Sequence, residues 1–556
     1  MSSTEQSSME SNGSPAALPK SSPHWMRHVR HVGLLTLVSR ILGLLRDIGM
    51  AALFGNGPLL DAFTLAFRLP NLSRRLFGEG ALTTAFLPKY VAALEEDRTE
   101  AEELATAVLG LLVGLLSLLT LFASLILYVL LVTDVLGASS RTMLILTAQM
   151  LPYVVLICLT AQMCAMLNAE GIFATPAAVP IVLNAVWIVA VFCLAPRFSG
   201  TDRQMEIIVL AILIGGVLQV GLPAAALWMK GFRLRWRSWQ RLRAAWRIFV
   251  SMMPIVFGLS ITQINAICDG ALAWWFAQPE QGEWIAPGSA SALYFGQRMY
   301  QFPLGIFGVA MGTVLFARLA MHVKSHRRDL VAHDVHEGLR FTAVIGLPAS
   351  AGMMILAHPI ASALLERGQF DAFDTLQTAQ TIVAYGSGVW AYLGITVLQR
   401  VFYAMNDART PVRIGLTAVG LNLVLNFPLM LLLGGAGLAW ATAIAAALQV
   451  VLLQRALRTT LETPVGHPGL PWTGKVLLAT FLMSAAVLGG DALWPESESK
   501  MMELLALAVS MVLAVFVYAA SLQILQVDEL ARILGFRGKR EAQETASDLD
   551  SNRHEK

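Results

Sequence analysis

Long apolar runs recur along the whole chain and constrain its fold more than any other feature. Charged residues make up 14% of the sequence, against about a quarter in soluble domains. A run of about 20 apolar residues is long enough to cross a bilayer as a helix. Such runs are far too many here for one buried core, so we predict an all-α polytopic membrane protein.

Counting these runs predicts about fourteen transmembrane helices. The second and tenth are too long to cross upright, so each must tilt, break or protrude. In the second span we expect the break at Pro70, because proline interrupts helical hydrogen bonding. The spans lie near 31–54, 60–92, 104–132, 142–167, 177–195, 205–229, 248–276, 289–317, 339–361, 375–404, 412–432, 436–456, 473–493 and 502–526.

An internal repeat organises these spans into two halves. Residues 62–86 match 292–316 at a constant shift of 230, with Arg68 aligned to Arg298. A second sequence similarity relates "LNAEGIFATP" (167–176) to "MNDARTP" (405–411). Repeated bundles that meet around a central site are typical of transporters. The predicted units are a disordered cytoplasmic tail (1–28), an N-terminal six-helix bundle (29–229), a basic amphipathic cytoplasmic linker (230–247), a C-terminal six-helix bundle (248–458), transmembrane helices 13 and 14 (459–526) and a charged cytoplasmic tail (527–556).

Lysine and arginine placement orients the bundle. Segment 230–247 carries seven basic residues, 318–340 carries five and 455–475 carries three, whereas the loops on the other side hold five in total. The positive-inside rule therefore places both termini in the cytoplasm. Segment 230–247 alternates arginine with aromatic residues, which suits a helix on an anionic membrane surface equally well as an ordinary basic loop.

Charged side chains inside three predicted spans indicate the function. Each arginine at mid-membrane costs roughly 3 kcal/mol, so six facing lipid would cost on the order of 18 kcal/mol. Singly, one could reach an interface or hold two helices together. As a set they indicate a watery cavity with surplus positive charge, which suits phosphate or pyrophosphate, since guanidinium groups bind these with two donors. The six arginines are 40, 46, 68, 74, 75 and 298, against Asp47, Asp61 and Glu79, with Arg75 and Glu79 spaced to pair.

Four stretches carry a resemblance to a known family. "SRILGLLRDIGMAALFG", "DAFTLAFRLPNLSRRLFGEGALTTAFLP", "QRMYQFPLGIFGVAMGTVL" and "AMNDARTPV" closely resemble the MurJ (MviN) family of the MOP superfamily, over roughly residues 30–526. Members flip lipid II, the undecaprenyl-pyrophosphate-linked peptidoglycan precursor, across the bacterial inner membrane. The resemblance implies the same role here, from inner to outer leaflet by alternating access.

Site residues follow from the same resemblance. It implies that Arg46 and Arg298 are the prime pyrophosphate ligands. One departure concerns Gln297, where the family commonly has an acidic residue, so a local counter-charge for Arg298 is missing. The full implied set in or near the central cavity is Arg40, Arg46, Asp47, Asp61, Arg74, Glu79 and Arg298.

Transport also needs an energy source. No phosphate-binding loop for ATP is present in the sequence, and we expect no cofactor beyond a coupling ion. Asp269, Asn422, Asn426 and Thr442 offer the oxygen ligands that Na⁺ would use if their spans converge. The two asparagines could instead hydrogen-bond neighbouring helices, and membrane potential alone could act on the charged cavity.

Three other function classes are a drug exporter, a flippase for a different lipid and a membrane-embedded enzyme. A drug exporter of the same superfamily should carry carboxylates and aromatic residues in its cavity, whereas a flippase for another polyprenyl-pyrophosphate oligosaccharide needs the same chemistry. We predict no enzyme: the four cysteines read as core residues, and His322, His326, His333 and His336 as a solvated loop in preference to a metal site. The expected partners are lipid II, membrane lipids and cell-wall synthesis machinery, not nucleic acid, for a protein working as a monomer.

Overall fold

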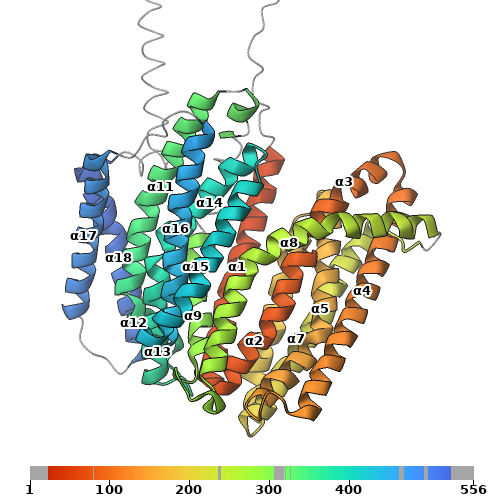
Figure 1. Ribbon diagram of the computed structural model, residues 1–556, viewed down its shortest axis with the longest axis horizontal. Coiled ribbons are helices and arrows are strands. Elements are labelled where there is room, and N and C mark those ends of the chain that lie inside the picture. Colours follow the sequence, from red (N-terminus) through yellow and green to blue (C-terminus); the bar gives the residue numbers. More distant parts are fainter. Residues whose placement is uncertain are drawn as a thin grey trace, which may run out of the picture.

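The computed structural model describes residues 23–78, 81–235, 239–305, 318–319, 321–325, 327–461, 469–493 and 499–527. All regular structure within these ranges is helical, which confirms the predicted class (Figure 1). The first half contains α1 (Pro23–Phe54), α2 (Pro58–Ser73), a π-helical turn η1 (Arg74–Gly78), α3 (Ala81–Glu96), α4 (Arg98–Thr133), α5 (Ser140–Ala169), α6 (Ala174–Val189), η2 (Ala190–Leu194), η3 (Ala195–Arg197) and α7 (Thr201–Met229).

The second half begins with a long bent helix, α8 (Trp239–Phe276). The remaining elements are η4 (Pro279–Gln281), α9 (Ser289–Pro303), α11 (Arg328–Ile355), α12 (Ala357–Leu365), α13 (Ala372–Ser387), α14 (Val389–Ala404), α15 (Arg409–Leu433), α16 (Gly435–Leu461), α17 (Leu470–Leu493) and α18 (Lys500–Ile524).

The helices form two lobes. In the N-lobe, α1 to α7 pack on one another, with α5 contacting α2, α4 and α7. In the C-lobe, α9, α11 and α13 to α16 pack together, and the α17–α18 pair lies against α11 and α12. Helix α8 joins them, because its first part lies across α3 and α4 of the N-lobe and its later part packs on α9 and α15 (Figure 1).

Nine described helices are long and apolar enough to cross a membrane, or ten if the bent pair α13–α14 is one span. That pair bends by 41° at Gly388, as the length of the tenth predicted span required. The other four predicted spans overlap α1, α2 to α3, α8 and α9, the helices that carry most of the charged residues singled out above. The end of the eighth predicted span, 306–317, lies outside the described residues. The count of fourteen stays a prediction.

The second predicted span is broken, but not where we expected. Pro70 lies inside α2, and the break comes after it, at the π-helical turn that begins at Arg74. The prediction of a break at Pro70 was therefore wrong. A π-turn adds a residue to the helical repeat, which changes the direction of the side chains that follow it.

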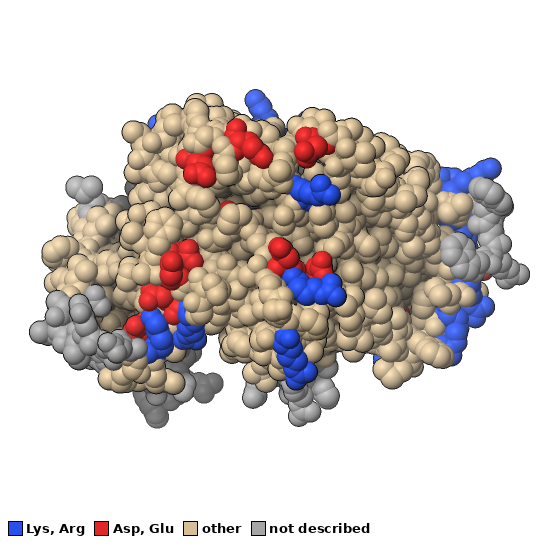
Figure 2. Space-filling view, turned by 90° about the horizontal axis from the view of Figure 1, so that it is seen from below, with Lys and Arg blue, Asp and Glu red and all other residues tan. Residues whose placement is uncertain are grey.

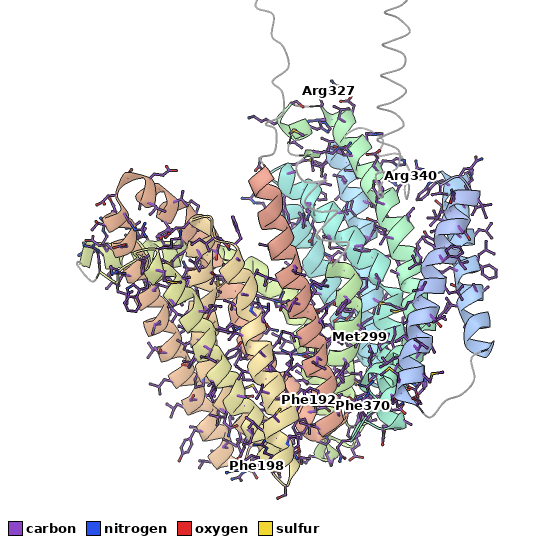
Figure 3. The ribbon with its side chains drawn as sticks, turned by 180° about the vertical axis from the view of Figure 1, so that it is seen from behind. Phe192, Phe198, Met299, Arg327, Arg340 and Phe370 are labelled. Carbon is purple, nitrogen blue, oxygen red and sulfur yellow. The ribbon has the colours of Figure 1, made fainter. Side chains whose placement is uncertain are left out.

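The two lobes meet at one end of the molecule, here called the closed end, which holds the α1–α2 loop, Gly288 and the segment from Gln369 to Asp374. The Gln369 N–H donates to Ala52 O at 2.9 Å, and the Asn56 N–H donates to Asp374 Oδ2 at 2.9 Å. Toward the other end, which carries Arg327 and Arg340, the ribbons of the lobes diverge, whereas Phe370 lies near the closed end (Figure 3). Figure 2 looks onto the closed end and shows acidic and basic side chains in small mixed groups on a largely uncharged surface.

Candidate functional site

Arg46 and Asp47 stand next to each other on α1 and form the centre of the site. Both are buried, with 4% and 2% of their surface exposed. Arg46 Nη2 donates to Asp47 Oδ1 at 2.7 Å, and Arg46 Nη1 donates to Asn184 Oδ1 of α6 at 3.2 Å. The guanidinium carbon lies 4.3 Å from the centre of the Trp187 ring, also on α6. The Arg46 charge is thus held by an ion pair, an amide and an aromatic face.

Arg298 reaches the same carboxylate from α9 in the other lobe. Its Nε donates to Asp47 Oδ2 at 2.8 Å, while 39% of its side chain stays exposed. One turn earlier on α9, the Tyr294 hydroxyl donates to Asp47 Oδ1 at 3.1 Å. Asp47 therefore supplies the counter-charge that Gln297 does not. Two guanidinium groups share one carboxylate across the lobe boundary, which leaves a net charge of about +1.

The other predicted charged residues of α1 and of the second span make contacts of their own. Arg40 is partly buried and its guanidinium packs directly against the backbone at Gly305. Arg74, the first residue of the π-turn, donates from Nη2 to Asn71 Oδ1 of α2 at 3.1 Å. Arg75 donates from Nη1 to Gln263 Oε1 at 2.7 Å, and Glu79, its predicted partner, lies outside the described residues.

Asp61 has a different position, at the closed end. Its carboxylate accepts from the Gly288 N–H at 2.9 Å and from the Ser291 N–H at 2.6 Å. Helix α9 has Gly288 at its N-cap, with a left-handed φ of +85° and no side chain of its own to cap the helix. Asp61 supplies the cap from another lobe, so the groups it holds belong to the protein.

The four predicted cation ligands come together from α8, α15 and α16. Asn426 Nδ2 donates to Asp269 Oδ1 at 2.9 Å, and Thr442 Oγ1 donates to Asp269 Oδ2 at 2.7 Å. The Asn422 amide lies 3.1 Å from Thr442 Oγ1 and within 3.3 Å of the Asn426 amide. Asp269 and both asparagines are buried. We call these four residues the polar cluster.

One polar cluster atom lacks a partner. Asn426 Oδ1 is buried, and nothing in the described part of the chain donates a hydrogen bond to it. An orphaned buried oxygen beside a carboxylate is a coordination position that a small hard cation would fill, because such ions prefer oxygen ligands. The residues present therefore fit the predicted cation.

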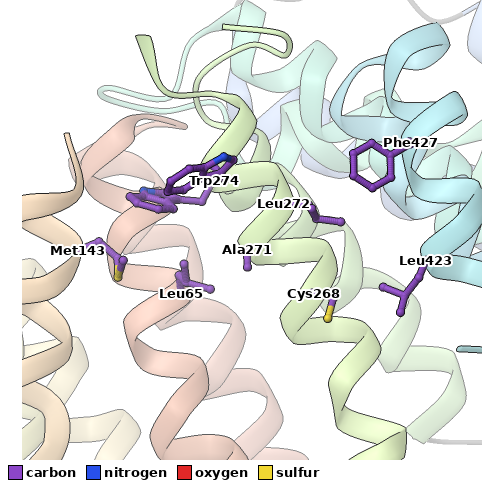
Figure 4. A pocket seen from close by; sticks show the side chains of 9 residues that line it. Leu65, Met143, Cys268, Ala271, Leu272, Trp274, Leu423 and Phe427 are labelled. Carbon is purple, nitrogen blue, oxygen red and sulfur yellow. The ribbon is translucent and has the colours of Figure 1, made fainter. Parts of the chain in front are cut away.

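An apolar cavity of about 460 Å³ is lined by residues of α2, α5, α8 and α15 (Figure 4). Cys268, Leu423 and Phe427 line it, and each is next in sequence to a member of the polar cluster. Leu65 of α2 and Met143 of α5 complete its N-lobe wall. The lining has no charged side chain, so this cavity does not suit the pyrophosphate of a substrate.

Sequence reasoning missed three members of the central site: Asn184, Trp187 and Tyr294. A signal existed for two of these, since Tyr294 stands four residues before Arg298 and Asn184 three before Trp187, which places each pair on one helical face. Their link to Arg46 was not visible, because it joins residues more than 130 positions apart.

The basic stretch after α7 contacts acidic residues of α4. Neither the predicted membrane-surface helix nor the alternative of an ordinary basic loop included these contacts. Arg235 Nε donates to Glu102 Oε2 at 2.7 Å, and Arg241 Nη1 donates to Glu100 Oε1 at 2.7 Å. Both glutamates belong to α4, and Glu102 is buried. The acidic segment near residue 100 is thus a docking surface for part of the basic stretch.

The predicted histidine loop is partly helical. Helix α11 begins at Arg328, so His333 and His336 lie on it, and His322 Nδ1 is 2.6 Å from Asp334 Oδ2. Asp334 is fully buried and also pairs with Arg318 at 2.6 Å. The loop part of the prediction is therefore wrong for these three residues, which lie in helical segments, although His333 stays exposed and His326 lies outside the described residues. No group of three or more metal-binding side chains occurs within the ranges described.

Comparison with known proteins agrees with this architecture. A family model described as "Lipid II flippase MurJ" matches residues 50–510. A "Probable lipid II flippase MurJ" of Vibrio cholerae is 33% identical over 482 residues, covering 83% of this chain and 87% of that protein.

Two solved structures share the fold. "Lipid II flippase MurJ, inward closed conformation" superposes with a TM-score of 0.74 at 23% identity, covering 90% of this chain and 99% of that one. An inward-facing multidrug resistance MATE family transporter of the MOP superfamily gives 0.63 at 13% identity, covering 76% and 94%.

Two repeated helical lobes that meet around a buried charged centre are the architecture of a membrane transporter. Within that class, the match over most of the chain assigns the family: this chain belongs to the MurJ family of lipid II flippases.

Proposed function

We propose that this protein translocates lipid II from the inner to the outer leaflet of the bacterial cytoplasmic membrane. The observation that carries the proposal is the pair of arginines, Arg46 and Arg298, that share Asp47 across the lobe boundary. Family membership supports the substrate, whose pyrophosphate is the anion that two guanidinium groups suit best.

Exchange of carboxylate for pyrophosphate is the proposed binding step. Arg298 is the more exposed of the two, so it meets the pyrophosphate first and releases Asp47 Oδ2. Arg46 keeps Asp47 and its α6 partners until Asp47 turns away. The ion pair thus keeps the cavity neutral enough to be stable when empty and becomes available only to an anion.

Alternating access is proposed to work between the closed end and the diverging end. By the positive-inside rule, the diverging end, with Arg235, Arg241 and Arg327, faces the cytoplasm, and both termini lie there. The described conformation then receives substrate from the inner leaflet. Opening toward the periplasm requires the contacts of Asp61 with Ser291 and of Asn56 with Asp374 to break.

A monovalent cation at the polar cluster is the proposed coupling ion. Asp269 would neutralise Na⁺, and the oxygens of Asn426 and Thr442 would replace part of its hydration shell. Membrane potential could add to this, since it acts on any net charge that moves across the bilayer.

The test uses the purified chain in lipid vesicles. Lipid II loaded in one leaflet should appear in the other, and a neutral analogue without the pyrophosphate should not. Arg298→Ala should abolish the movement, whereas Arg203→Ala, which removes a surface pair with Glu206, should leave it unchanged. Equal transport of a polyprenyl-pyrophosphate with an unrelated sugar would favour a broader flippase, and transport of a cationic drug in its place would favour an exporter.

A further inference from the structure

Arg68 and Arg298 occupy the same position in the two halves of the repeat, 230 residues apart. Arg298, on the second helix of the C-terminal half, pairs with Asp47 on α1, the first helix of the other half. Arg68, on α2, lies against α8, the first helix of the C-terminal half. There it interacts electrostatically with Asp269 without forming an ion pair, so each half places an arginine within electrostatic range of an aspartate of its partner half.

The contact of Arg68 with α8 is close. A Cβ added to Gly270 would lie 2.6 Å from Arg68 Nη1 and 2.7 Å from its Cζ, so the guanidinium fills the space that this glycine leaves. Gly270 directly follows Asp269 in the sequence. The missing side chain therefore brings the Arg68 charge to the polar cluster.

Arg68 has a charged neighbour, Asp269, but incomplete hydrogen bonding. Its Nη1 is buried, and no described residue accepts a hydrogen bond from it. Asp269 and the hydroxyl groups of Tyr294, Tyr300 and Tyr385 lie within electrostatic range. Tyr294 itself contacts Asp47, so Arg68 stands between the polar cluster and the arginine site.

We infer that Arg68 is the resident counter-charge of Asp269 and the positioning residue that couples the polar cluster to the anion site. The inference rests on the proposed cation site. Na⁺ entering the cluster competes with Arg68 for the single carboxylate. The displaced guanidinium then adds its charge to the side of Tyr294 and Arg298, where the pyrophosphate binds.

Coupling of this kind is reciprocal. If Na⁺ frees Arg68 for the anion, then the anion, by holding Arg68, must raise the affinity for Na⁺ by the same factor. Cation and lipid-linked pyrophosphate therefore bind together more tightly than each does alone, which ties ion entry to substrate capture.

Thermal stability of the full chain in detergent gives the cation affinity without a transport assay, because a ligand that binds the folded state stabilises it. NaCl is titrated against choline chloride at constant ionic strength. We expect saturable stabilisation in the natural protein and none in Asp269→Asn. Arg68→Gln and Arg68→Met should respond at Na⁺ concentrations lower by about fivefold or more, the lower limit of typical coupling. Arg68→Lys, which keeps the charge, and the surface variant Arg203→Gln should respond like the natural protein.

A second arm starts from the natural protein. Farnesyl pyrophosphate should lower the Na⁺ concentration required by the natural protein, and this effect should vanish in Arg68→Gln. A Na⁺ response that is unchanged or weaker in Arg68→Gln and Arg68→Met overturns the coupling role while leaving the cation site intact. If these variants do not fold, absence of the farnesyl pyrophosphate effect in the natural protein overturns it. No Na⁺ response in the natural protein overturns the cation site and the role of Arg68 together.

Discussion

Asp61 of α2 binds Ser291 of α9, which stands at the same position of the repeat, 230 residues later. The carboxylate accepts from both the N–H and the hydroxyl of Ser291, each at 2.6 Å. The two halves of the chain are therefore joined through equivalent positions at the closed end. The Asp61 side chain therefore holds a helix of the other lobe at the closed end, and the substrate contact that the family resemblance implied for it stays a prediction.

Asp61→Ala should loosen the closed end without weakening substrate capture. Removing the carboxylate leaves two buried N–H groups unpaired, at about 1–3 kcal/mol each. We expect a lower melting temperature and faster labelling of a cysteine placed at Gly57, with unchanged affinity for lipid II. Asp202→Ala, on the exposed start of α7, is the matched control. Loss of lipid affinity at normal stability would show that Asp61 contacts substrate after all.

Alanine variants of Arg46 and Arg298 should both lose transport but should differ in folded yield. Each alanine variant should stop transport, with a loss of roughly 2–5 kcal/mol for a charge pair in a low-dielectric site. Arg46→Ala should also lower the folded yield, because it strips contacts from Asn184 and Trp187, whereas Arg298→Ala should not. Lysine variants should keep partial function at best, since lysine lacks the planar pair of donors. Membrane abundance must be measured beside transport, and normal transport by both alanine variants would remove the pyrophosphate site.

Removing the charge of Asp47 tests whether this carboxylate competes with the substrate pyrophosphate for Arg46 and Arg298. Asp47→Asn keeps the shape and removes the charge that Arg46 and Arg298 share. We expect lower stability and tighter binding of farnesyl pyrophosphate, because the anion no longer competes with a carboxylate. Combining Asp47→Asn with Arg298→Ala should give non-additive changes, which a double-mutant cycle measures. Additive effects would mean that the ion pair and the anion site are independent.

Na⁺ binding by the polar cluster should weaken when a single hydroxyl ligand is removed. Thr442→Val removes the hydroxyl that donates to Asp269 and offers an oxygen to the cation. The Na⁺ concentration needed for stabilisation should therefore rise about tenfold or more. Thr480→Val, which removes a buried hydroxyl from α17, is the matched control and should leave the Na⁺ response as it is. An equal loss in both variants would point to general packing and not to a cation ligand.

The contact between Arg235 and Glu102 should stabilise the attachment of α8 to the N-lobe. Glu102 is buried and Arg235 is half-exposed, so we expect Arg235→Gln to cost about 1 kcal/mol after solvent screening. Exchanging the charges, with Glu102→Arg and Arg235→Glu together, should recover part of the stability lost by either change alone. Thermal melts compare them with Arg203→Gln, which breaks an exposed pair. A double variant no better than the single ones would leave the pair without a stabilising role.

The sequence by itself determined the membrane class, the two halves and the chemical nature of the centre. Hydropathy depends on local composition, and six arginines in apolar spans predict a shared polar interior. The repeat marked α2 and α9 as equivalent through Arg68 and Arg298. The ligand types at Asp269, Asn422, Asn426 and Thr442 were also readable, because each side chain is polar within an apolar run.

Only the tertiary structure decided which charge faces which. Asp47 belongs to both Arg46 and Arg298, Asp61 caps α9, and α4 glutamates hold Arg235 and Arg241. Each of these contacts except the one between Arg46 and Asp47 joins residues more than 130 positions apart, so no local pattern encodes it. The predicted break at Pro70 was likewise misplaced, since a bilayer-embedded helix can keep a proline where neighbouring helices satisfy the freed backbone groups. Pairing between distant charges follows from packing, and packing depends on the whole chain at once.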